Sequence, residues 1–312
     1  MKILFLSALL AASVITSFAQ STTGDILGTI QDSTGAVIAD AKVEARNLDT
    51  NATKEATSST DGTFRFSLLP AGRYEVTVQK SGFAKYRQGP IVLQLNQAAD
   101  LRVNLQLSAG AETVTVMTDA PLINTTNAEI GVNFDSKRIA ELPLSTNRNL
   151  LNLAGSVPGV SQISSGNSQF GSSGNQGTES GGLQFASNGM RTRSNAFIID
   201  GQDSYGPSTG GVVQSMNNPD IISEVRIITN QFAPEYGRAA GSVVNVITKS
   251  GTNSFHGSAF WFHNDNHLNT LSNTDKKAGF TAAPFRIENQ FGGTFGGPII
   301  KNKTFVFGSL LR

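Results

Sequence analysis

Few residues in this chain combine the types and the spacing that metal or acid–base chemistry needs. His263 and His267 stand four residues apart, a spacing that lets two imidazoles bind one metal ion when both lie on a helix. The intervening residues are Asn-Asp-Asn, which disfavour a helix, and no Glu follows the first histidine. We therefore expect both histidines in a loop and predict no metal site.

Two carboxylates also lie close together in Asp200-Gly201-Gln202-Asp203. Such a pair suits a glycosidase or a calcium site, but an Asp-Gly turn at a strand end accounts for it without chemistry. The sequence has no phosphate-binding G-x-x-x-x-G-K motif. The glycine-rich run Gly292–Gly297 lacks the βαβ surroundings of a dinucleotide site. We predict no enzyme activity, no catalytic residue and no cofactor.

Composition favours strands and turns over helices. Of 312 residues only 15% are charged, and 32 are glycine. The formal net charge is +1 and no cluster of Lys or Arg occurs, so nothing predicts nucleic-acid binding. The absence of cysteine excludes disulfides and thiolate metal sites.

The first residues have the form of a secretory signal peptide. Lys2 is followed by an apolar run from Ile3 to Ile15 and by the small-x-small pattern Ser17-Phe18-Ala19. We predict that residues 1–19 are removed by cleavage between Ala19 and Gln20. An uncleaved anchor is the alternative, but a spanning helix needs about 20 apolar residues. Because no other run is long enough, membrane insertion would require a closed β-barrel.

Residues 20–108 alternate between apolar and polar positions, with a turn every eight to twelve residues or so. This pattern predicts an antiparallel β-sandwich. The expected strands lie around residues 26–30, 41–46, 53–57, 64–68, 74–78 and 101–107.

The turn and core residues of this region resemble the carboxypeptidase regulatory-like domain. The resemblance implies a transthyretin-like sandwich that accompanies other domains and is not itself a peptidase. We expect Phe64, Phe66 and Tyr74 to be core residues rather than ligand-stacking ones. The pattern is carried by Gly28, Asp32, Gly35, Ala41, Val43, Asp61, Gly62, Phe64, Leu69, Pro70, Gly72, Tyr74, Gly82 and Phe83.

A linker at residues 109–120 contains an extended Thr/Val segment. Such a segment can add as a strand to a partner's sheet, or it can simply be a connecting strand. Beyond the linker, residues 121–250 contain a short helix predicted over Ser136–Glu141 and stopped before Pro143. A second helical pattern covers Asn147–Leu153, and Ser161–Gly182 is a Ser/Gly/Asn run that we expect to be a mobile loop.

The segment Pro219–Gly257 resembles the end of the plug domain of TonB-dependent outer-membrane receptors. In that family a strand leads through a Tyr-Gly turn to a G-G-V-N-V-I-T-K strand, here Gly241–Lys249 with Ser242 as the second position. The runs ELPLSTNRNLLNLAGSVPGV and NGMRTRSNAFIIDGQD resemble plugs of the Oar-like type. The resemblance implies a TonB box that pairs with TonB in the periplasm, and our candidate for it is Glu112, Thr113, Val114, Thr115 and Val116.

Residues 251–312 change to amphipathic, aromatic-rich segments. Expected strands cover Phe255–Asn264, Ile287–Gly297 and Phe305–Leu311, with Phe291, Gly293 and Phe295 on one face of the second. Three strands cannot close a barrel, because bacterial barrels use about 8 to 26 or more. We therefore expect this chain to be an N-terminal fragment that carries the first strands of an incomplete outer-membrane β-barrel.

The sequence thus predicts a mainly β protein: a β-sandwich, an α+β plug and barrel strands. The family resemblance implies transport of an unidentified extracellular substrate across the outer membrane of a Gram-negative cell, with energy drawn through TonB. The sandwich would lie in the periplasm, and outer-membrane lipid would contact the barrel. Siderophores, cobalamin, glycans, peptides and exported proteins remain possible substrates. The alternative is a surface protein that binds carbohydrate or mediates adhesion.

Overall fold

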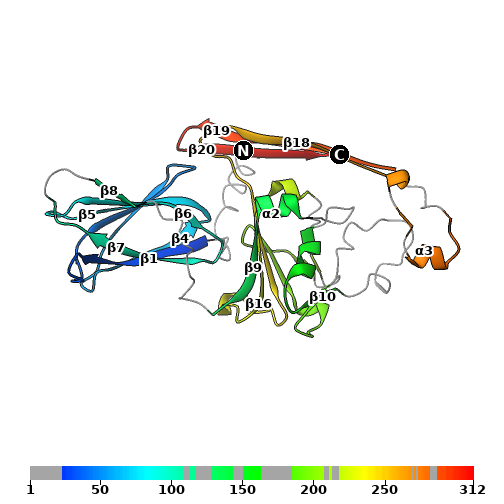
Figure 1. The fold of residues 1–312 in the computed structure, drawn as a ribbon, viewed down its shortest axis with the longest axis horizontal. Coiled ribbons are helices and arrows are strands. Elements are labelled where there is room, and N and C mark those ends of the chain that lie inside the picture. The colour runs from blue at the N-terminus through cyan, green and yellow to red at the C-terminus, as the bar shows by residue number, and fades with distance from the viewer. Residues whose placement is uncertain are drawn as a thin grey trace, which may run out of the picture.

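The computed structural model describes residues 23–108, 113–116, 128–142, 150–162, 185–206, 211–212, 218–268, 270–271, 273–281 and 287–312. In these residues the chain forms a β-sandwich, a mixed sheet with short helices, and a three-stranded antiparallel sheet (Figure 1). Ala19, Gln20 and Glu112 lie outside the described residues, as does most of the predicted loop Ser161–Gly182.

The sandwich consists of two sheets that enclose one apolar core. Phe64, Phe66 and Tyr74 are almost fully buried in it, which confirms their prediction as core residues. The rings of Phe64 and Phe66 meet edge to face at 6.0 Å. One sheet has the order β4-β1-β7 and the other β3-β2-β5-β6-β8. The strands are β1 (Thr23–Asp32), β2 (Lys42–Asn47), β3 (Thr53–Thr57), β4 (Thr63–Pro70), β5 (Gly72–Gln79), β6 (Lys85–Leu93), β7 (Ala98–Leu105) and β8 (Thr113–Val116).

The prediction of a purely antiparallel sandwich was wrong. Strand β1 pairs in parallel with β7, and β6 pairs in parallel with β8. Alternation reports which face of a strand is buried and carries no information on the direction of its neighbour. Strand β6 itself was not predicted, since Gly89 and Pro90 interrupt its pattern.

The sheet of the plug region has the strand order β13-β12-β17-β16-β9. The principal strands are β9 (Ile130–Asp135), β12 (Ala196–Ile199), β13 (Gln202–Asp203), β16 (Ile222–Asn230) and β17 (Val243–Thr248). Shorter elements are β10 (Val160–Gln162), β11 (Phe185–Ser187), β14 (Tyr205–Gly206), β15 (Gly211–Val212), and the 3-10 turns η3 (Thr192–Ser194), η4 (Pro219–Ile221) and η5 (Pro234–Tyr236).

Helix α2 (Ser136–Glu141) and the 3-10 helix η1 (Leu150–Ser156) cover one face of this sheet. Helix α2 has the predicted bounds because Asp135 caps it: its carboxylate accepts the Arg138 backbone N–H at 2.7 Å. The second predicted helix takes the tighter 3-10 form and begins at Leu150. Phe134, Leu150 and Val225 are buried between these helices and the strands.

The last sheet is an antiparallel ladder of β18 (His256–Asp265), β19 (Ile287–Ile300) and β20 (Thr304–Leu311). The 3-10 turn η6 (Asn266–Leu268) and helix α3 (Asn273–Lys277) follow β18. Trp261 and Phe291 are directly opposed and exposed on one face, whereas Ser258 and Thr294 share a hydrogen bond on the other. The predicted alternation is therefore confirmed. In Figure 1 this sheet lies above the plug region and reaches the near end of the sandwich.

Replacing Gly28 with alanine should destabilise the sandwich. A Cβ atom there would lie 2.9 Å from the Phe64 ring and would also collide with the Leu101 carbonyl oxygen. We expect a loss of about 1–3 kcal/mol in the free energy of unfolding, measured by denaturant titration. Gly308→Ala is the control, because nothing lies within 4 Å of a Cβ there. An equal stability of both variants would contradict this packing.

Candidate functional site

The segment predicted as a partner-binding strand lies at the edge of the sandwich. Thr113–Val116 forms β8, which runs parallel to Lys85–Gln88 of β6. The described part of the candidate box is thus an extended strand, as strand addition requires. It is also the outermost strand of its sheet, so one of its edges is paired with β6 and the other faces away from the sandwich.

The chain closes the edge of β6 over a longer stretch than β8 alone. The Ala84 N–H donates to the Gln106 carbonyl at 2.8 Å, and the Ser108 N–H donates to the Gly82 carbonyl at 3.0 Å. Residues 106–108 therefore pair antiparallel to residues 82–84, just before β6, and β8 then runs parallel to residues 85–88. Open strand edges invite pairing with other chains, and here the protein's own chain covers that edge.

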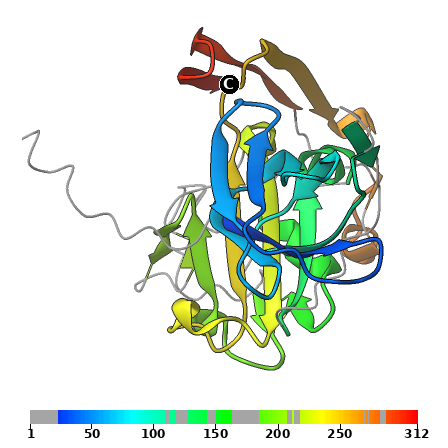
Figure 2. The ribbon, with the colours of Figure 1, turned by 90° about the vertical axis from the view of Figure 1, so that its left-hand side faces the viewer.

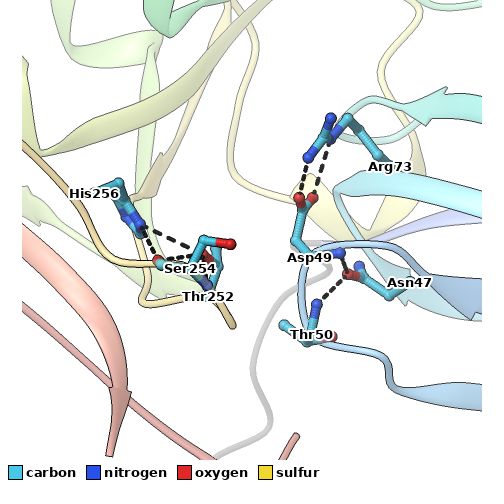
Figure 3. Close-up of polar contacts among 7 residues, drawn as sticks. All are labelled: Asn47, Asp49, Thr50, Arg73, Thr252, Ser254 and His256. Carbon is cyan, nitrogen blue, oxygen red and sulfur yellow. Dashed lines mark hydrogen bonds and ion pairs between the residues drawn. The ribbon is translucent and has the colours of Figure 1, made fainter. Parts of the chain in front are cut away.

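A cleft of about 660 Å³ lies where the three units meet. The sandwich contributes Asn47, Asp49 and Tyr74, the plug region contributes Ser223, and Thr252 and His256 come from the segment that enters β18. In Figure 3 the Asp49 and Arg73 side chains stand across the cleft from Thr252, Ser254 and His256. The cleft is thus bounded by parts of the chain about 200 positions apart in sequence.

Polar groups at the cleft form hydrogen bonds and an ion pair with one another. Arg73 forms an ion pair with Asp49, which raises the pKa of Arg73. The Asn47 side-chain oxygen accepts the backbone N–H groups of Asp49 and Thr50 at 2.9 and 3.0 Å (Figure 3). On the opposite wall, the His256 Nδ1 atom lies 3.0 Å from the Ser254 carbonyl oxygen. These contacts shape the two turns and do not form a nucleophile–base arrangement.

Asp200 has a structural role, in agreement with the predicted Asp-Gly turn. Asp200 and Gly201 both have positive φ, at 48° and 80°. The Asp200 carboxylate accepts the Thr248 backbone N–H and its hydroxyl, each at 2.8 Å, and so ties the end of β12 to the end of β17. Asp203 instead pairs with Arg238, beside a hollow of about 440 Å³ lined also by Tyr205.

The prediction that both histidines lie in a loop was wrong for His263. His263 lies within β18, where its Nδ1 atom is 2.9 Å from the Asn289 side-chain oxygen. His267 lies in η6, and its Nδ1 atom is 2.6 Å from Asp265. The described residues contain no group of three or more His, Asp or Glu side chains arranged to hold a metal ion.

Two charged residues of β16 were not anticipated from the sequence. Glu224 and Arg226 are only 8% and 7% exposed, and they are the only charged residues of this mostly buried strand. Burial raises the pKa of Glu224, partly opposed by hydrogen bonds from Leu95 and Asn133 and by the charge of Arg226. Two charges alternating within an apolar strand were the available signal, because buried charges need dedicated partners.

None of the helices in the described ranges has the length and apolar character to cross a membrane. Comparison with known proteins gives two family matches. Residues 25–107 match the carboxypeptidase regulatory-like domain, and residues 247–312 match the outer membrane beta barrel domain. The chain is also 30% identical over 307 residues to the TonB-dependent transporter Oar of Myxococcus xanthus. This chain resembles TonB-dependent outer-membrane receptors of the Oar type.

The match to Oar covers 93% of this chain but only 26% of Oar, so the chain spans about a quarter of that relative. The Oar resemblance inferred from the sequence is confirmed, as is the predicted outer-membrane location. Two receptor structures align with 58% of the chain and 24% of their own length. These are the siderophore receptor PirA from Acinetobacter baumannii (21% identity, TM-score 0.41) and a mutant ferric enterobactin receptor PfeA from Pseudomonas aeruginosa (22%, 0.39).

The pairing of β8 with β6 can be tested by cross-linking, since the chain has no cysteine of its own. Arg87 and Thr115 are direct partners in the parallel register, so Arg87→Cys with Thr115→Cys should form a disulfide. Bonded Cα atoms lie about 4.4–6.8 Å apart, as in neighbouring strands. The control pair Gln88→Cys and Thr113→Cys is three positions out of register and should stay reduced. Equal oxidation of both pairs would reject this register.

Proposed function

We propose that this chain forms the periplasmic sandwich, the plug and the first wall strands of a TonB-dependent outer-membrane transporter. The observation that carries this proposal is the 30% identity to the transporter Oar across 93% of the chain. This receptor takes up a substrate from outside the cell, or moves one across the outer membrane, with energy that TonB delivers from the inner membrane. Outer-membrane lipid contacts the exposed aromatic face that contains Trp261 and Phe291.

The organisation we propose has five parts. Residues 1–19 are a signal peptide cleaved between Ala19 and Gln20, residues 20–108 are the sandwich, and residues 109–120 are the linker with the TonB box. The plug covers 121–250, and the barrel begins within 251–312. The plug region, on this proposal, occludes the barrel until it is displaced.

The proposed contact with TonB is strand addition at Glu112–Val116. Strand addition binds a partner through main-chain hydrogen bonds, which explains why a short Thr/Val segment suffices. Support comes from the extended conformation of Thr113–Val116 and from its position as the outermost strand of its sheet. Among the described residues no strand pairs with its outer edge, which therefore offers backbone N–H and C=O groups to a partner strand.

Catalysis and carbohydrate binding are less well supported than TonB-dependent transport. The glycan-binding alternative needs aromatic rings on the sandwich surface, but Tyr74 and Tyr86 are 2% and 5% exposed. The side chains around Asp200 and the cleft hold turns together, as described above. We therefore propose a non-enzymatic protein that acts by binding and movement.

Proline substitutions within the box should weaken retention of this chain on the immobilised C-terminal domain of TonB. Val114→Pro with Val116→Pro removes two backbone donors from the strand, so we expect retention to fall about tenfold or more, equivalent to ~1.4 kcal/mol. Val114→Ala with Val116→Ala keeps both donors and should bind like the native chain. Unchanged retention of the proline variant would reject Glu112–Val116 as the box.

A further inference from the structure

The main chain of Leu95 is held at both of its polar groups by two side chains of the plug sheet. Leu95 lies between β6 and β7 and is fully buried. Its N–H donates to the Glu224 carboxylate, with N–O distances of 3.1 and 3.3 Å, and its carbonyl accepts from Arg226 Nη1 at 2.9 Å. Glu224 and Arg226 are two positions apart on β16, so both side chains project from the same face.

Further polar contacts surround the hydrogen bonds that Leu95 forms with Glu224 and Arg226. Asn133 of β9 donates to Glu224 at 2.8 Å and to the sandwich residue Gln94 at 2.9 Å. Arg226 also forms a buried ion pair with Glu129 at 3.2 Å. Asn96, next to Leu95, donates a hydrogen bond to the Tyr236 hydroxyl. Buried charges are costly unless they are paired, and here the sandwich loop supplies part of that pairing.

A second attachment joins the sandwich to the barrel hairpin. Asn302, in the turn between β19 and β20, accepts from the side chains of Asn51 and Asn253, each at 2.9 Å. Its backbone N–H donates to the Asn253 side chain at 2.8 Å, and the Asn253 N–H donates to the Asp49 carbonyl at 2.9 Å. In Figure 2 the hairpin between β2 and β3 reaches up to the sheet of β18–β20.

From these two attachments we propose that the sandwich is a strap, which ties plug strand β16 to the first barrel hairpin and restrains the plug. The Leu95 end is the firm anchor, because its hydrogen bonds are buried and one of them comes from the charged Arg226 guanidinium. The Asn302 end is exposed and uncharged, so it is the end that releases first. This restraint goes beyond the proposed transport function and does not depend on TonB binding.

Spin labels can test the strap, because a protein without cysteine accepts labels only at introduced sites. One pair, Glu55→Cys on β3 and Lys137→Cys on α2, reports the sandwich–plug distance, and both native side chains are well exposed. A second pair, Lys42→Cys and Lys303→Cys, reports the distance between sandwich and barrel hairpin. In the otherwise native chain we expect one narrow distance distribution for each pair.

Leu95→Asp is the decisive variant, because it puts a charge at the fully buried residue whose main chain bonds Glu224 and Arg226, and it leaves every plug residue intact. Leu95 is not part of the sandwich core, so the sandwich should still fold, as circular dichroism would verify. We expect the narrow sandwich–plug peak to be lost. Val92→Asp is the matched control, since Val92 is 55% exposed on β6, and it should keep the peak. A narrow peak that survives Leu95→Asp would overturn the strap, as would a broad distribution in the native chain.

The order of release needs the second label pair. Asn302→Ala should broaden the sandwich–hairpin distance while the sandwich–plug distance stays narrow, because it removes only the exposed attachment. Broadening of both distances together would contradict two separate attachments.

The strap should weaken as the pH rises. Burial raises the pKa of Glu224 above its ordinary value of 4.5 in the docked form, and nearby Asp135 adds to this, while Leu95, Arg226 and Asn133 oppose it. Glu129, paired with Arg226, is a further carboxylate at this contact beside Asp135, and the facing sandwich residues Gln94–Gln97 are uncharged. When the sandwich is docked on the plug, Glu224 keeps a proton that it releases when the two units separate. Docking is therefore strongest below the ordinary pKa of Glu224, and it is lost progressively as the pH rises through the raised pKa of the docked form.

The measurement for this prediction is the narrow sandwich–plug fraction recorded as a function of pH. The native chain should lose that fraction toward higher pH, whereas Glu224→Gln should show a flat response. A narrow fraction that rises with pH in the native chain would contradict Glu224 as the cause.

Discussion

Backbone hydrogen bonding at sheet edges is the constraint on which this structure depends most. In a chain built mainly of strands, each edge presents N–H and C=O groups that need a partner. The sandwich covers the edge of β6 with residues 106–108 and 113–116 of its own chain. The proposed function assigns a second role to the same segment, because an outermost strand such as β8 can also accept a partner strand.

Burial of charge is the second constraint, and it links the units. Glu224 and Arg226 are the only charged residues of strand β16, and they are stabilised through the main chain of Leu95. The sandwich is thereby bound to the plug by the plug's own need for hydrogen-bond partners. At the opposite end, uncharged asparagine side chains join exposed turns. The two attachments differ in strength for this physical reason.

Local signals made much of the fold predictable. Helix α2 has its predicted bounds because Asp135 caps its start and Pro143 follows its end, and strand β3 matches its prediction as well. The direction of β7 relative to β1 was not predictable, because alternation carries no information on direction, and β6 was missed because Gly89 and Pro90 interrupt its alternation. The hydrogen bond between Leu95 and Glu224 joins residues 129 positions apart in sequence, and no local pattern encodes such a pairing.

The most direct test of TonB coupling through this chain is amide hydrogen exchange with and without the periplasmic C-terminal domain of TonB. The proposed function predicts that TonB slows exchange at Thr113–Val116 and leaves the barrel strands β18–β20 unchanged. Exchange at Thr113–Val116 that stays the same at saturating TonB would contradict the assignment of this segment as the point of attachment.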